Sequence, residues 1–134
     1  MGDAGAEDDG VVYLLMEDVL EFFAAIIGGT PEQAADQLRD RGALEGALAR
    51  PRMHGHYEGS DIALQGAVLA HGIAESQPFI DGDKRAALIA MLTFLEINGV
   101  VVEASDQELA RWIIELSGGL TPEQLAEQIR GAAR

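Results

Sequence analysis

Residues 77–85 read Gln-Pro-Phe-Ile-Asp-Gly-Asp-Lys-Arg and lead directly into Ala-Ala-Leu-Ile-Ala-Met-Leu-Thr-Phe-Leu at 86–95. The second stretch is apolar on nearly every side, which predicts a helix buried at the centre of the fold. The first stretch is a charged, glycine-containing loop at the N-terminus of that helix. Unpaired N–H groups and the positive end of the helix dipole favour an anion there, such as a phosphate.

Apolar residues recur at helical spacing along most of the chain. We expect helices at about 16–27, 42–50, 61–76, 84–98, 105–117 and 122–132, with a further helix start at Thr30. Thr30 and Thr121 are expected as N-caps, and Ser105 with Glu108 as a capping box. Pro51 is expected to end the second of these, and residues 53–60 lack any period and are expected to be a loop. Short strands are expected at 11–14 and 100–103. The predicted fold class is all-α, with one domain over residues 11–134 behind a disordered acidic tail at 1–10.

Composition limits the functions open to this chain. Its 134 residues carry a net charge of −14, which argues against direct binding of nucleic acid or anionic lipid. The acidity either serves solubility or favours a basic partner. There is no cysteine, which excludes disulfides and thiolate chemistry. No signal peptide and no apolar segment of about 20 residues is evident, so we expect a cytoplasmic protein without membrane association.

The loop resembles the signature of the Fic/Doc family, His-x-Phe-x-Asp/Glu-Gly/Ala-Asn-Lys/Gly-Arg. The positions that keep this pattern are Phe79, Asp81, Gly82, Lys84 and Arg85. Gln77 stands where the family has its catalytic His, and Asp83 stands where it has Asn. Residues 41–51, 67–77, 106–109 and 120–125 are also similar to segments of Doc-type members, in the same order.

The resemblance implies a compact helical domain in which a nucleotide's phosphates rest on the signature loop. Members transfer part of a nucleotide, commonly AMP, to a protein hydroxyl, and Doc-type toxins transfer a phosphate from ATP. Many are held inactive by a partner protein that inserts a helix. The implied cofactors are therefore Mg²⁺ and ATP or another nucleotide, and the implied partners are a protein target or an antitoxin-like protein.

Gln77 decides whether that chemistry survives. The family's His accepts the proton of the attacking hydroxyl, which requires a group that titrates near the working pH. A carboxamide does not titrate in water, so Gln77 can hydrogen-bond a substrate but cannot act as a base. Loss of general-base catalysis typically costs about 10²–10⁴-fold in rate. We therefore expect the family's transfer reaction to be lost or strongly reduced.

The two aspartates of the loop each allow two interpretations. Asp81 occupies the position of the family's Mg²⁺-binding carboxylate, but an Asp before Gly also suits a turn. Asp83 would repel a phosphate unless a cation lies between them, and it could equally cap the helix. Lys84 and Arg85 match the family's phosphate-binding pair, and Gly82 permits close approach of the backbone to a ligand.

Other conspicuous side chains receive structural interpretations. Phe79 is expected to be buried as an anchor of the loop, and His71 to be buried in the helix before it. His54 and His56 with Glu58 are expected to lie on a solvated loop rather than to bind a metal. By family resemblance, Tyr57 is expected to border the groove and help hold the target.

Three functions remain open on the sequence. The chain could be a degenerate Fic/Doc protein that binds a nucleotide without transferring it. It could be an enzyme for a small molecule, with Gln77, Asp81 and Asp83 as the polar groups of the groove; a close carboxyl pair can supply both an acid and a base. It could also be a toxin-like interaction module bound by an antitoxin-type partner.

Overall fold

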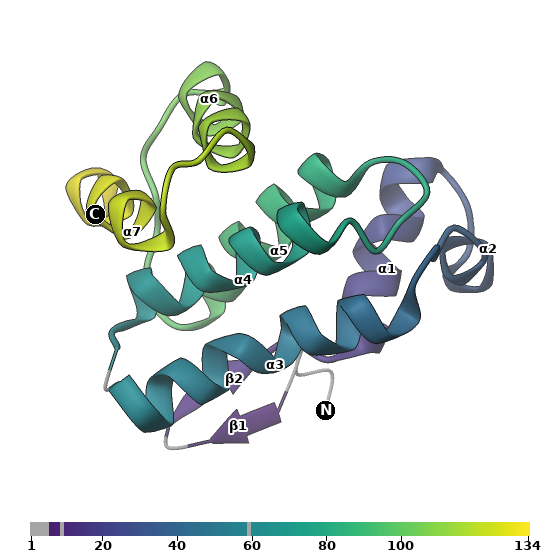
Figure 1. Ribbon diagram of the computed structural model, residues 1–134, viewed down its shortest axis with the longest axis horizontal. Coiled ribbons are helices and arrows are strands. Elements are labelled where there is room, and N and C mark those ends of the chain that lie inside the picture. The colour runs from purple at the N-terminus through teal and green to yellow at the C-terminus, as the bar shows by residue number, and fades with distance from the viewer. Residues whose placement is uncertain (1–5, 9, 59) are drawn as a thin grey trace.

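The computed structural model describes residues 6–8, 10–58 and 60–134, and over these the chain forms seven helices and one β-hairpin (Figure 1). The elements are β1 (Ala6–Asp8), β2 (Val11–Tyr13), α1 (Met16–Ile27), α2 (Pro31–Asp36), α3 (Arg41–Glu58), α4 (Ile62–Ser76), α5 (Asp83–Ile97), α6 (Asp106–Ser117) and α7 (Pro122–Ala132). The predicted all-α fold class is confirmed. No helix among the described residues has the length and apolar character needed to cross a membrane.

Helices α4 and α5 form the centre of the molecule (Figure 1). Helix α3 and the hairpin lie on one side of them, α6 and α7 on another, and α1 and α2 at the end where α4 turns into α5. Ala87, Met91 and Phe94 of α5 are fully buried, as are Leu69 and Ile73 of α4 within about 1%. The apolar run after the signature loop is therefore the buried central helix that the sequence predicted.

Two glycines of α4 allow its neighbours to pack closely. A Cβ atom on Gly66 would lie 2.7 Å from Cδ2 of Leu95 in α5. A Cβ atom on Gly72 would lie 3.1 Å from Cβ of Ala47 and 3.2 Å from its Cα in α3. A Cβ atom on Gly66 would require the Leu95 side chain to move, and one on Gly72 would press on the backbone of α3, so the α3–α4 contact in particular favours glycine.

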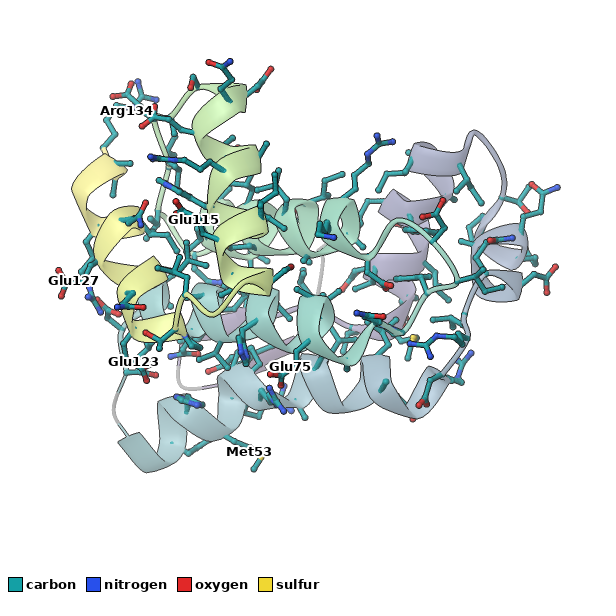
Figure 2. The ribbon with its side chains drawn as sticks, turned by 45° about the horizontal axis from the view of Figure 1, so that its top comes forward. Met53, Glu75, Glu115, Glu123, Glu127 and Arg134 are labelled. Atoms are coloured by element: carbon teal, nitrogen blue, oxygen red, sulfur yellow. The ribbon has the colours of Figure 1, made fainter. Side chains whose placement is uncertain are left out.

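Helix α3 is longer than predicted. It passes through Pro51 and continues to Glu58, so the expected end at residue 50 and the expected loop at 53–60 are wrong. Proline at an interior position loses one helical hydrogen bond, yet its fixed φ is itself helical. The Pro51 ring is fully buried, and this burial offsets the lost bond. On the far side of the same helix, Met53 points away from the molecule (Figure 2).

The strand predictions need two corrections. Ala6–Asp8 pairs antiparallel with Val11–Tyr13, with Glu7 opposite Val12, so these three residues are not the disordered tail that was expected; residues 1–5 and 9 lie outside the described part of the chain. Residues 100–103 make only an isolated bridge between Val102 and Ala133, because the partner that reaches them is the end of α7 and not another strand.

Asn98 fastens the hairpin to the end of α5. Its side-chain Oδ1 accepts the N–H of Val12 at 2.8 Å, and its Nδ2 donates to the carbonyl of Val12 at 2.9 Å. The same Nδ2 donates to the carbonyl of Phe94 at 2.8 Å. One amide side chain thereby pairs with backbone polar groups of both β2 and the last turn of the central helix α5.

The predicted helix caps are confirmed. The hydroxyl oxygens of Thr30, Ser105 and Thr121 each accept the N–H of the residue three positions on, at 3.1 Å. The side-chain Oε1 atoms of Gln33, Glu108 and Gln124 in turn accept a hydrogen bond from the N–H of the cap residue. These reciprocal pairs are capping boxes, and they locate the first turns of α2, α6 and α7.

Asp61 joins the start of α4 to α7. Its Oδ1 accepts the N–H of Leu64 at 3.0 Å as the N-cap of α4. Its two oxygens also accept Nε and Nη2 of Arg130 at 2.8 and 2.9 Å. These hydrogen bonds to Arg130 hold the pKa of Asp61 below its ordinary value, against the opposing effect of partial burial. One carboxylate thus serves both helix capping and contact between helices.

We predict that Asp61→Ala lowers the free energy of unfolding by about 1–2 kcal/mol, because the cap and the half-exposed ion pair are both lost. Asp61→Asn keeps an efficient cap and isolates the charge. Because the folded-state pKa of Asp61 is depressed, its charge stabilises the fold at neutral pH and stops doing so as pH falls through that pKa. The difference between wild type and Asp61→Asn, measured by urea denaturation, should therefore shrink below about pH 4. A difference that is constant down to pH 2 would contradict this assignment.

Candidate functional site

The loop between α4 and α5 begins at a strained residue. Gln77 is the C-cap of α4 with φ 49° and ψ 60°, and within the described chain it is the one non-glycine residue with positive φ. Its N–H donates to the carbonyl of Ile73 at 3.1 Å. Its own carbonyl accepts a hydrogen bond from the Arg39 guanidinium. Left-handed backbone costs a residue with a Cβ about 1–2 kcal/mol, so the surrounding contacts must hold Gln77 in place.

A backbone bridge holds the rest of the loop. The N–H groups of Arg39 and Asp40 both donate to the carbonyl of Pro78, at 2.7 and 3.1 Å. The N–H of Ile80 donates to the carbonyl of Gln37 at 2.8 Å. Residues 37–40, which follow α2, therefore run antiparallel to the loop and form a strap across it, centred on the bridge between Leu38 and Phe79.

Phe79 anchors the loop in the core, as predicted. Its ring stacks on that of Phe23 in α1, with centroids 3.9 Å apart and planes 10° from parallel, and it is 1% exposed. Gly82 lies against the same α1 ring, since a Cβ atom there would be 3.2 Å from Cε1 of Phe23. Gly82 also has φ 86°. Both its conformation and its surroundings therefore favour the absence of a side chain.

Gly82, not Asp83, is the N-cap of α5, so the helix-cap interpretation of Asp83 is wrong in detail. Asp83 is the first helical residue, and its Oδ1 accepts the N–H of Phe79 at 2.8 Å across the loop. The cap residue makes no side-chain hydrogen bond to the first turn of α5. The first N–H groups of α5 therefore face the loop without the side-chain acceptor that caps most helices.

The surroundings of the Asp83 side chain disfavour its charged form. Burial raises the pKa of Asp83 above its ordinary value, and the nearby charge of Asp81 adds to this effect. The hydrogen bond from the Phe79 N–H and the positive charges of Arg39 and Lys84 act in the opposite direction. A raised pKa in a groove is typical of functional carboxyl groups, although structural ones show it too.

Asp81 accepts the N–H of Gly82 at 2.9 Å through Oδ1, as expected of a turn residue. The turn interpretation and the metal interpretation are compatible, because a second carboxylate oxygen remains. No group of three or more His, Cys, Asp or Glu that could hold a metal ion occurs among the described residues. Mg²⁺ does not need such a group, since it often takes one or two carboxylates together with phosphate oxygens and water.

The loop borders an open groove of about 920 Å³. The predicted site residues brought together along it are Gln77, Asp81, Gly82, Asp83, Lys84 and Arg85. The side chains of Gln77, Lys84 and Arg85 are exposed. Tyr57 belongs to α3, but its side chain lies outside the described part of the chain, so its expected place at the groove edge stays a prediction.

The groove contains side chains whose role the sequence analysis missed. His71, expected to be buried in the core, is 25% exposed at its side chain and lines the groove. Glu75, one helical turn further along α4, lines it as well, and its side chain is labelled in Figure 2. The i, i+4 spacing of His71 and Glu75 was the available signal, since residues so spaced share one helix face.

Apolar side chains form another wall of the groove. Phe23, Ile26 and Ile27 from α1 line it together with Ile80 of the loop and Leu116 of α6. Ile27 is 41% exposed and Ile80 is 63% exposed. The groove therefore combines a charged floor at the start of α5 with an accessible apolar side, which is the usual mixture in ligand and peptide sites.

The fold is a helical domain with the signature loop between its two central helices, and the comparison with known families agrees with the class that this arrangement defines. The chain belongs to the Fic/DOC family, whose model matches residues 13–95. It is also similar to the protein named Toxin Doc from Mycolicibacterium smegmatis, with 36% identity over 94 residues. That match covers 69% of this chain and 68% of the relative.

We predict that Gln77→Gly raises the free energy of unfolding by about 1 kcal/mol, because glycine adopts the left-handed conformation without a Cβ clash. Gln77→Ala is the matched control: it removes the same exposed side chain but keeps the clash, so it should bring no gain. Urea denaturation of the three proteins measures this. Equal stability of the glycine and alanine variants would show that residue 77 is not strained.

Proposed function

We propose that the protein binds the phosphates of a nucleotide at the N-terminus of α5, with Mg²⁺. The observation that carries this proposal is the groove, where the uncapped first turn of α5 lies beside the exposed side chains of Lys84 and Arg85. Backbone N–H groups and the helix dipole supply one part of an anion site. Arg and Lys supply the other, through bidentate contact and a point charge respectively.

Asp81 is the residue that would hold Mg²⁺. Its Oδ1 accepts the Gly82 N–H, and the other carboxylate oxygen of this exposed side chain remains for a metal ion. When bound, the metal neutralises phosphate charge and fixes the phosphate orientation. Asp83 favours the same arrangement, because a cation at this place would relieve repulsion both between the two carboxylates and between Asp83 and a phosphate.

We further propose that the family's transfer of AMP or phosphate to a protein hydroxyl is lost or strongly reduced in this protein. The Gln77 carboxamide borders the groove at the position of the motif His and can donate or accept a hydrogen bond there. It cannot take up the proton of an attacking hydroxyl. The cost expected from this single replacement is about 10²–10⁴-fold in rate.

We predict that calorimetric titration with ATP shows binding that depends on Mg²⁺, weakened at least about tenfold by Arg85→Ala, since a charge-assisted bond to phosphate is lost. Arg111→Ala on α6, a charge change outside the groove lining, is the matched control and should bind as wild type. Absence of nucleotide binding with and without Mg²⁺ would refute the proposed function.

We predict that Asp83→Asn tightens ATP binding about tenfold at neutral pH, because one negative charge next to the phosphates is removed while the amide oxygen can still accept the Phe79 N–H. The pKa of Asp83 is raised, so the wild-type carboxyl is protonated at a higher pH than an ordinary aspartate. The advantage of Asp83→Asn over wild type should therefore diminish as pH falls toward about 4. A constant ratio of affinities over this range would contradict the role given to Asp83.

The apolar wall of the groove favours a second function, that of a toxin component held by an antitoxin-type protein. The similar protein from Mycolicibacterium smegmatis is named a toxin. Exposed Ile27 and Ile80 offer a partner apolar surface beside charged groups, and the net charge of −14 favours a basic segment.

We predict that expression of the wild-type chain slows bacterial growth less than Gln77→His does, because the variant restores a proton acceptor at the motif position. Gln77→His with Arg85→Ala is the control, and it should be as mild as wild type, since phosphate binding is impaired. Growth curves and colony counts after induction measure the effect. Identical growth with wild type and Gln77→His would argue against a latent transferase.

A further inference from the structure

His71 places a titratable imidazole in the groove. The chain has three histidines. Of these, His54 and His56 belong to α3 and do not line the groove, whereas His71 does, together with Gln77 and the first residues of α5. Imidazole is the side chain whose ordinary titration falls between pH 5 and 8. The groove therefore contains a group suited to proton transfer although residue 77 is not one.

Glu75 lies beside this imidazole. Its Oε2 lies 3.5 Å from Nε2 of His71, and both side chains project from the same face of α4. A carboxylate in this position faces one of the two ring nitrogens. A base next to a group that can orient it is a recurring arrangement in sites that activate a nucleophile.

The charges around His71 support the same role. Besides Glu75, the charged residues that line the groove are Asp81, Asp83, Lys84 and Arg85, from the loop and the start of α5. Helices α1 and α6 contribute only uncharged side chains to the lining, including Leu116 and Ser117 of α6. The cations thus gather at the phosphate end, and His71 lies beside Glu75 further along α4.

Resting on the proposed nucleotide binding, we propose that His71 is the proton acceptor of this groove, in place of residue 77. A hydroxyl oxygen attacks the terminal phosphorus atom of the bound nucleoside triphosphate and forms a new P–O bond. Its proton passes to the His71 imidazole, which lies beside the Glu75 carboxylate. The P–O bond to the nucleoside diphosphate breaks, and the electron pair leaves with the diphosphate.

The position of His71 also changes where the hydroxyl must lie. Gln77 lies six positions after His71, which corresponds to about 9 Å along the helix axis. The hydroxyl is therefore expected further along α4, toward Leu116 and Ser117 of α6, which complete the same groove. A proton acceptor on α4, such as His71, lies closer to a hydroxyl at this place than residue 77 of the loop does.

Release of inorganic phosphate from ATP and Mg²⁺, with water as the attacking hydroxyl, tests the proposal. We expect a slow wild-type rate. His71→Asn should lower it at least about tenfold, with calorimetric ATP affinity within twofold of wild type. His56→Asn on α3 is the matched control and should behave as wild type.

The imidazole signals in NMR spectra give a readout independent of turnover. Addition of ATP and Mg²⁺ should shift the ring signals of His71, while those of His54 and His56 stay unchanged. His71→Gln serves as a second variant if His71→Asn does not fold. ATP binding with equal rates in wild type and both His71 variants, or with an unchanged His71 signal, would overturn the role of His71 alone. No ATP binding by any of the proteins would overturn the proposed function and this inference with it.

Discussion

The close packing of α5 against α4 is the constraint on which the other elements depend. Gly66 allows the side chain of Leu95 to lie where a Cβ atom would otherwise be, and the two helices bury their apolar faces against each other. Because α5 is apolar nearly all round, it also needs cover on its remaining sides, which α1, α6 and the β-hairpin supply (Figure 1). The central pair thereby fixes where the connection between α4 and α5 emerges, and with it the position of the groove.

Within that connection, most of the support comes from residues that do not carry the charges of the groove. Phe79 buries its ring on Phe23, and the strap at 37–40 satisfies the backbone of the neighbouring residues. The side chains of Lys84 and Arg85 are exposed at the groove and make no part of this support. The two aspartates do both, since Asp81 accepts the Gly82 N–H and Asp83 accepts the Phe79 N–H while both line the groove.

The sequence was sufficient for the central helix, the caps and the place of the signature loop at the start of that helix, because each depends on local patterns. Ser105 and Glu108, for example, need only the helix that they begin. The sequence was insufficient where contacts between residues far apart in the chain determine the structure. The burial that lets α3 continue through Pro51 depends on packing, and the bridge from Val102 to Ala133 joins residues 31 positions apart. The spacing of His71 and Glu75 indicates a shared face of α4, but that this face lines the groove depends on how the loop, α1 and α6 meet.

The strap limits how a polypeptide can approach the loop. An extended chain that adds to a neighbouring segment as a new strand needs free carbonyl and N–H groups along one edge. Here the carbonyl of Pro78 and the N–H of Ile80 are already used by residues 37–40. A peptide can pair with this edge of the loop only after the strap has been displaced. Recognition at the intact groove must therefore rely on side chains and on the start of α5.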